Sequence, residues 1–144
     1  MKTQILGAAL AVIALPALAQ DAPTGDAGAG ETAFNRQCVA CHVVVDADGN
    51  KLAGRNAKVG PNLYGVAGRV IGSQDGFRYS DGFATLNGQG DTWDEAHFVG
   101  YVQDPTGWLR ETLSDNSARG KMAFKVRSET DAADIYAYLH SVAQ

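Results

Sequence analysis

The chain has 144 residues, a length typical of a single domain with one small hydrophobic core. Its 12 Lys and Arg residues against 16 Asp and Glu give a formal net charge of −4, and this acidic balance argues against general nucleic-acid binding. Only two cysteines are present, which is too few ligands for a structural zinc site.

The first 19 residues have the pattern of a cleaved export signal. Lys2 provides a positive start, residues 6–18 are mostly apolar, and Ala17-Leu18-Ala19 is a small-x-small cleavage site. The apolar run is too short to favour an uncleaved membrane anchor, and Pro16 also argues for processing. We therefore expect a periplasmic protein that begins at Gln20 and has a net charge of 11 − 16 = −5.

Residues 20–28 are small, acidic and rich in glycine, which predicts a flexible segment. A helix is predicted from about Ala29 to the first cysteine. Phe34 precedes Cys38 by four residues and therefore shares its helix face. The folded domain is expected to span residues 29–144.

The motif Cys38-x-x-Cys41-His42 is typical of covalent c-type haem attachment. Each thiol adds to one porphyrin vinyl group, so the spacing of the cysteines must match that of the vinyls. The adjacent histidine then becomes the proximal ligand of the iron. A thioredoxin-like dithiol is disfavoured because no βαβ pattern surrounds the motif. A disulfide across two residues would close too small a loop to stabilise the fold much.

Residues 43–58 are predicted to form a loop. The cluster of residues 46–50 loosely suggests a calcium site, but the twelfth residue from Asp46 is Ala57 rather than Glu, so a solvated turn is favoured. Pro61 follows in the stretch Gly60-Pro61-Asn62-Leu63. Its carbonyl oxygen is a candidate acceptor for the free ring N–H of His42, with a plain turn proline as the alternative.

The glycine-rich residues 65–91 are predicted to be irregular chain draped over a flat ligand. No GxGxxG pattern opens a helix after a strand here, which disfavours a nucleotide loop. Arg69, Tyr79 and, just beyond, Trp93 are the side chains best suited to meet buried carboxylates.

Three helices are predicted after residue 91. Thr92-Trp93-Asp94-Glu95 is predicted to be a capping box with Thr92 as N-cap, and the helix it starts carries Tyr101 and stops before Pro105. A short helix is predicted over about residues 106–113. The last helix is predicted from near Ser128, with an apolar stripe that packs on the first helix through Gly30 and Phe34. This stripe consists of Ala132, Ile135, Leu139 and Val142.

Met122 is the only methionine that remains once Met1 leaves with the signal. It lies in a predicted loop, 122 − 42 = 80 residues after His42, so it can approach from the opposite side of a porphyrin. A thioether is a good sixth ligand for haem iron, and Met/His ligation raises the reduction potential. A core filler is the ordinary role of a lone methionine, and His97 and His140 are the rival ligands.

Taken together, the chain resembles a class I cytochrome c of the bacterial cytochrome c2 type over about residues 28–142. The resemblance rests on Cys38-x-x-Cys41-His42, Gly60-Pro61-Asn62-Leu63, Gly76-Phe77-x-Tyr79, Trp93, Lys121-Met122-x-Phe124 and Ala137-Tyr138-Leu139. It implies an all-α cytochrome c fold, with three to five helices wrapped round one covalently bound haem c. It also implies that Arg69, Tyr79 and Trp93 lie by the haem propionates, and Tyr101 near Met122.

The function implied by the resemblance is that of a soluble, monomeric one-electron carrier rather than an enzyme. It would take an electron from a cytochrome bc1-type complex and pass it to a terminal oxidase, photosynthetic reaction centre or reductase. A haem enzyme or gas-binding protein would need an open sixth position, and a haem subunit of a larger complex is a third alternative. A basic docking ring is predicted from Lys58, Arg119, Lys121, Lys125 and Arg127.

Overall fold

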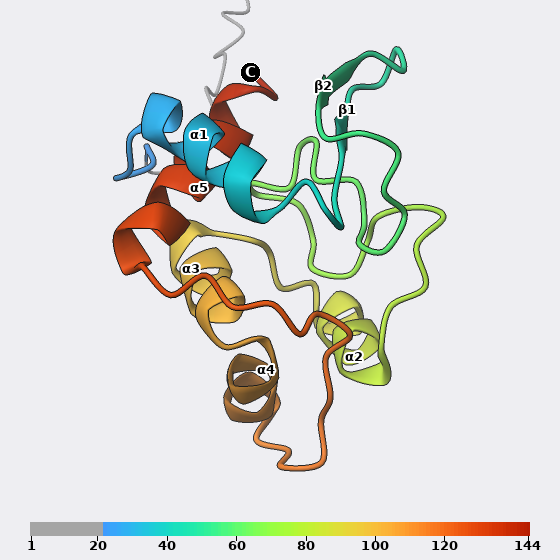
Figure 1. Ribbon diagram of the computed structural model, residues 1–144. Coiled ribbons are helices and arrows are strands. Elements are labelled where there is room, and N and C mark those ends of the chain that lie inside the picture. Colours follow the sequence, from blue (N-terminus) through green and yellow to red (C-terminus); the bar gives the residue numbers. More distant parts are fainter. Residues whose placement is uncertain (1–21) are drawn as a thin grey trace, which may run out of the picture.

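The computed structural model describes residues 22–144, so the predicted signal and its cleavage site lie outside the described residues. Five helices and one short hairpin make up the fold (Figure 1). In chain order the elements are α1 (Ala27–Gln37), β1 (Val44–Val45), β2 (Lys51–Ala53), α2 (Asp81–Gln89), α3 (Glu95–Gln103), α4 (Pro105–Leu113) and α5 (Glu129–Ser141). The predicted helical class is therefore confirmed. Within residues 22–144, no helix is both long and apolar enough to cross a membrane.

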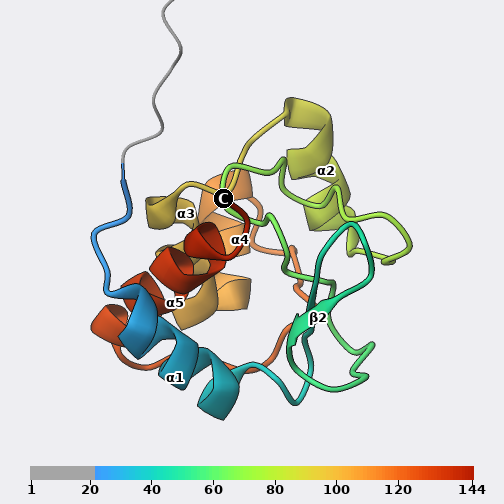
Figure 2. The same cartoon turned by 90° about the horizontal axis from the view of Figure 1, so that it is seen from above.

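The first and last helices pack side by side, as the apolar stripe predicts (Figures 1 and 2). Phe34 of α1 is fully buried, and its ring centre lies 5.5 Å from that of Tyr138 on α5. Gly30 allows the two backbones to approach, because a Cβ at this position would lie 1.9 Å from the carbonyl oxygen of Asp134. Ala132, Ile135 and Leu139 of the stripe are buried.

Helix α1 begins at Ala27, two residues before its predicted start, because Asp26 is its N-cap. The Asp26 carboxylate accepts the N–H of Ala29 at 2.7 Å. Residues before the helix are tied to two other helices. The N–H of Thr24 donates to Glu95 at 2.8 Å, and the N–H of Asp26 donates to Asp134 at 2.7 Å.

Three elements were not predicted. Strands β1 and β2 pair antiparallel around the turn of residues 46–50, with Val44 opposite Ala53. The Asp46 carboxylate accepts backbone N–H groups within this turn, which agrees with the interpretation as a solvated turn. Helix α2 lies within the stretch predicted to be irregular, and it buries Phe83 and Leu86.

The predicted capping box at residues 92–95 is wrong in its N-cap. Helix α3 starts at Glu95, and Asp94 caps it by accepting the N–H of His97 at 2.7 Å. Glu95 does not reach back to Thr92, because its carboxylate is bonded to Thr24. The next helix, α4, starts at Pro105, one residue before the predicted start, with Asp104 as its N-cap.

Candidate cofactor site

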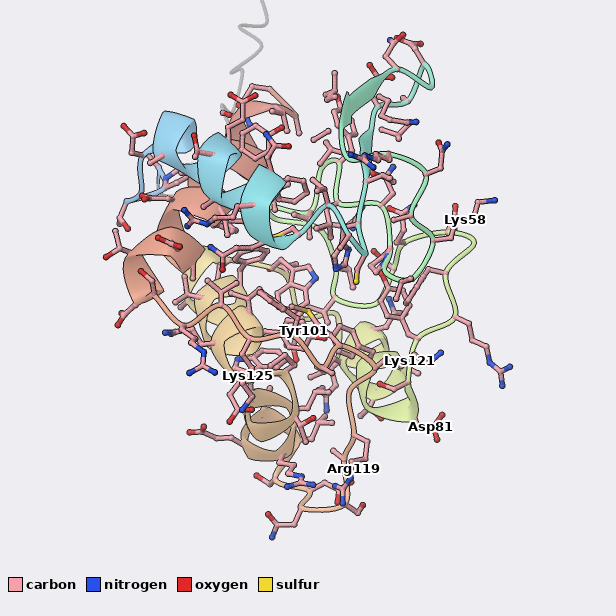
Figure 3. All side chains as sticks on the ribbon, in the orientation of Figure 1. Lys58, Asp81, Tyr101, Arg119, Lys121 and Lys125 are labelled. Atoms are coloured by element: carbon pink, nitrogen blue, oxygen red, sulfur yellow. The ribbon has the colours of Figure 1, made fainter. Side chains whose placement is uncertain are left out.

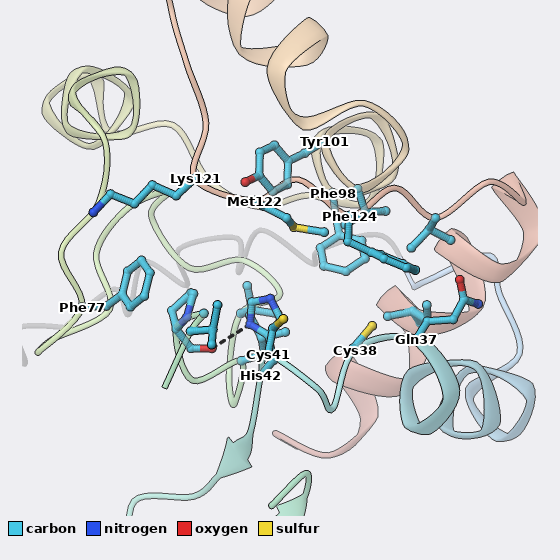
Figure 4. Close-up of a pocket in the computed structure, with 18 of the residues that line it drawn as sticks. Gln37, Cys38, Cys41, His42, Phe77, Phe98, Tyr101, Lys121, Met122 and Phe124 are labelled. Carbon is cyan, nitrogen blue, oxygen red and sulfur yellow. Dashed lines mark hydrogen bonds between the residues drawn. The ribbon is translucent and has the colours of Figure 1, made fainter. Parts of the chain in front are cut away.

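A cavity of about 490 Å³ lies among α1, α3 and the segments around residues 60 and 122 (Figure 4). Its wall is mostly apolar, with Leu63, Val66, Phe83, Phe98 and Ile135 among the lining side chains. All nine site residues predicted from the sequence line it: Cys38, Cys41, His42, Pro61, Arg69, Tyr79, Trp93, Tyr101 and Met122. The rivals His97 and His140 are absent from this lining.

The His42 ring is fixed by the chain that follows it. Its Nδ1 lies 2.9 Å from the carbonyl oxygen of Pro61, drawn as a dashed line in Figure 4. A carbonyl can only accept, so Nδ1 carries the proton and Nε2 is left as a free ligand atom. Burial lowers the pKa of His42 while the Pro61 bond acts in the opposite direction, so the neutral ring is favoured at pH 7.

Glycine is needed beside this ring. A Cβ on Gly60 would lie 2.2 Å from Cε1 of His42, so only a bare backbone packs against the imidazole face. The loop is held in place by backbone bonds to the motif, from Gly60 N–H to the Cys41 carbonyl at 2.8 Å and from Leu63 N–H to the Val43 carbonyl at 2.9 Å. The ring orientation is therefore built into the local fold.

The two thiols lie at the edge of the cavity, where α1 ends. A turn presents them, with the N–H groups of Cys41 and His42 donating to the Cys38 carbonyl at 3.1 and 2.9 Å. Burial, and secondarily Cys41, raises the pKa of Cys38 to about 12. A thiol held protonated is a poor redox nucleophile, which argues against a thioredoxin-like dithiol. Among residues 22–144 no group of three or more His, Cys, Asp or Glu side chains is placed to hold a metal ion.

Met122 and Tyr101 lie together on the side of the cavity that faces His42 (Figure 4). The two rival histidines lie outside the cavity lining. His97 has its Nδ1 3.0 Å from the Thr92 carbonyl oxygen, and its side chain is 41% exposed. His140 lies in the last turn of α5.

Polar groups gather in one part of the lining. Arg69 donates to the carbonyl oxygens of Tyr64 and Asn62 at 3.0 and 3.1 Å, and to Gln74 Oε1 at 2.6 Å. Burial lowers the pKa of Arg69 and raises that of Tyr79.

Ser80 is a site residue that sequence reasoning missed. It lines the cavity, and its hydroxyl is buried without a hydrogen-bond partner among the described residues. Ser80 stands at the N-cap position of α2 but makes no side-chain capping bond. Its free hydroxyl and the Arg69 cation fit a ligand that carries carboxylates, while the apolar wall and the edge thiols fit its ring. The residues present therefore fit a haem c.

Comparison with known proteins agrees with this geometry. Residues 27–143 match the family described as Cytochrome c. The chain therefore belongs to the cytochrome c family, whose members carry electrons on covalently bound haem, and it has one haem c.

Within that family the similar proteins include bacterial cytochromes c2. Cytochrome c2 of Rhodovulum adriaticum is 62% identical over 119 residues, which cover 83% of this chain and 94% of the relative. Cytochrome c2 of Cereibacter sphaeroides is 54% identical and covers 99% of this chain and 98% of the relative. A crystal structure of cytochrome c2 from Rhodobacter sphaeroides has a TM-score of 0.79 at 54% identity, covering 83% of this chain and 97% of that one. The chain is thus a class I cytochrome c of the c2 type.

Proposed function

We propose that the chain is a soluble periplasmic one-electron carrier in which Cys38 and Cys41 attach the haem and His42 and Met122 are its axial ligands. The observation that carries this proposal is that His42 and Met122 line one cavity with both thiols at its edge. A bound haem c supplies an iron whose charge changes by one electron. The His42 ring is held by the Pro61 carbonyl and does not need to reorient between the two charge states.

The haem carboxylates are received by Arg69, Tyr79, Trp93 and Ser80, which all line the cavity. Arg69 is pre-positioned for a propionate, because backbone carbonyls already fix its guanidinium. Ser80, Tyr79 and Trp93 supply uncharged donors from the same cavity wall. Tyr101 stands beside Met122 and limits access of water to the thioether.

A carrier is favoured over a haem enzyme or a gas-binding protein. Those two functions need an open sixth position, whereas Met122 lines the wall opposite His42. A carrier instead needs a rigid site with two permanent ligands, which keeps structural change during electron transfer small.

The partners follow from the proposed place of the protein in an electron-transfer chain. A cytochrome bc1-type complex would donate the electron, and a terminal oxidase, reaction centre or reductase would accept it. Export by residues 1–19 would bring the carrier to the side of the membrane where haem c is attached. With the leader removed, the carrier meets these complexes as a peripheral monomer.

The docking face is proposed at the cavity mouth. Val59 and Phe124 are 72% and 48% exposed there, and large apolar side chains of this kind suit a contact surface. Lys58 directly precedes Val59, and Lys121 lies three positions before Phe124. Figure 3 labels both lysines. Two other members of the predicted basic ring are less available to a partner than the sequence suggests, because their charged groups are already bonded. Lys125 pairs with Asp104 at 2.8 Å, and Arg119 is bonded to carbonyls of its own loop.

Absorption spectra of the purified mature protein and of a Met122→Ala variant test the proposal. The oxidised wild type should show the Fe–S charge-transfer absorption, and intact mass should show one added haem and loss of residues 1–19. Met122→Ala should lose that absorption, lower the reduction potential and bind exogenous imidazole. If the band and the potential are unchanged in the variant, Met122 is not the ligand. In that case His97 and His140 are tested next.

A further inference from the structure

Residues 119–125, here called the methionine strap, lie along the cavity with little backbone support. Just before the strap, the Ala118 carbonyl accepts Nε–H of Arg110 at 3.2 Å. Just after it, the N–H of Val126 donates to the Val102 carbonyl at 2.8 Å. Between these anchors, no strap residue makes a backbone–backbone hydrogen bond within the described chain. The strap's position therefore depends on its side chains.

Two lysines fix the strap, one on each side of Met122. Lys121 donates to the Arg78 carbonyl and its ammonium lies 5.9 Å from the centre of the Phe77 ring (Figure 4). Lys125 lies on the other side, with its Nζ 2.8 Å from Oδ1 of Asp104.

Asp104 is a fixed point for this second contact. It stands between α3 and α4 and caps α4 by accepting the N–H of Gly107 at 3.2 Å. The hydrogen bond from Lys125 is the largest cause that lowers the pKa of Asp104, so the carboxylate is charged at pH 7. Asp104 does not line the cavity. Within residues 22–144, its ion pair with the strap is made to Lys125.

We propose that Asp104 is a positioning residue for Met122, which holds the methionine strap against the cavity through Lys125. The inference rests on the proposed function, because the ligand role of Met122 gives this position its chemical consequence. Without the pair, the strap leaves the cavity wall more often. The hydrogen bond from the Val126 N–H to the Val102 carbonyl, where the strap ends, then opens more often, and an external ligand competes better for the side of the cavity that Met122 lines.

The ion pair between Lys125 and Asp104 is here called the tether. Three substitutions at Asp104 and Lys125 distinguish the tether from the other roles of these residues. Asp104→Asn removes the charge but keeps a good helix N-cap. Lys125→Gln removes the partner charge, whereas Lys125→Arg keeps it. Arg127→Gln is the matched control, since Arg127 is exposed and has no ion pair in residues 22–144. Each variant is made in the mature haem protein.

The first readout is hydrogen exchange of the Val126 amide, which is hydrogen-bonded to the Val102 carbonyl where the strap ends, and the second is imidazole affinity together with the Fe–S charge-transfer absorption. Asp104→Asn and Lys125→Gln should each raise exchange and imidazole affinity by about two- to fivefold, the range expected for an exposed ion pair. The double variant should be no worse than either single variant. Lys125→Arg and Arg127→Gln should match the wild type.

Unchanged exchange in both single variants, or additive effects in the double variant, would overturn the tether. The same holds if Arg127→Gln acts as strongly as Lys125→Gln. The two readouts distinguish failure of the proposed function from failure of the proposed tether. A wild type without the Fe–S band contradicts Met122 as ligand, while hydrogen exchange still tests the contact between Asp104 and Lys125.

Discussion

Replacement of Gly30 by alanine should destabilise the protein, although alanine is the better helix former. The new Cβ would lie 1.9 Å from the Asp134 carbonyl oxygen and 2.9 Å from Cβ of Tyr138. The first contact is with backbone, so no rotamer change relieves it and α1 must move away from α5. Overpacking costs about 1–3 kcal/mol, and a contact this short falls at the upper end. Helix propensity returns about 1 kcal/mol at most, so we expect a net loss of about 2 kcal/mol.

Thermal and denaturant unfolding of the mature haem protein measure this loss. The midpoint temperature should fall by roughly 5–10 °C for a domain of this size. Gly88→Ala in α2 is the matched control, because a Cβ there meets nothing within 4 Å. The control should be neutral or gain up to about 1 kcal/mol. Equal stability of Gly30→Ala and wild type would refute the reasoning that the backbones of α1 and α5 cannot separate cheaply.

Two further outcomes are expected. Tyr136→Phe removes a buried hydrogen bond of 3.1 Å to the Trp93 carbonyl, which still accepts the N–H of Gly68, so unfolding should become easier by only about 0.5–1.5 kcal/mol. A loss of stability above about 3 kcal/mol would show that the Tyr136 hydroxyl stabilises the fold by more than this one hydrogen bond. Electron transfer to a bc1-type complex or an oxidase, followed by stopped flow, should slow as salt rises and slow further at low salt in Lys121→Glu. Lys51→Glu on the hairpin is the control, and rates that stay flat or rise with salt would contradict basic docking.

The site could be predicted because its chemistry is local or compositional. Cys38, Cys41 and His42 lie within five consecutive residues, a spacing that is itself typical of covalent haem attachment. Apart from Met1, Met122 is the only methionine in the chain. Neither feature depends on where the helix boundaries are predicted. All four residues line one cavity.

The parts that were missed depend on contacts between distant segments. Helix α2 has nine residues and contains Gly82 and Gly88, so its local propensity is weak. Burial of Phe83 and Leu86 stabilises it, and the sequence does not show what these side chains pack against.

Both the cap of α3 and the role of Ser80 illustrate the same limit. Thr92 and Asp94 are both residue types found at N-caps, aspartate more often than threonine. The predicted capping box fails because Glu95 is bonded to Thr24, 71 positions away along the chain. Ser80 likewise precedes a helix as an ordinary cap would. Only the structure shows that its hydroxyl makes no cap and is buried at the cavity instead.

Acid should remove the contribution of Asp104 to stability. Its pKa is lowered from the ordinary 3.8, first by the hydrogen bond from Lys125 and then by the N–H of Gly107. A carboxyl whose pKa is lower in the folded state contributes stability above its unfolded pKa, and this is lost as pH falls through the folded value. The wild type should therefore be more stable than Asp104→Asn at pH 7, by an amount that shrinks below the ordinary 3.8.

Urea unfolding of both proteins between about pH 7 and pH 3 measures this difference. Asp75→Asn is the control, because the Asp75 carboxylate has no hydrogen bond or ion pair within residues 22–144. The free energy of unfolding of Asp75→Asn should differ from that of the wild type by the same amount across this pH range. An advantage over Asp104→Asn that is the same at both ends of the range would mean that ionisation of Asp104 does not contribute to stability, because the pH-dependent part of the difference comes only from the charge.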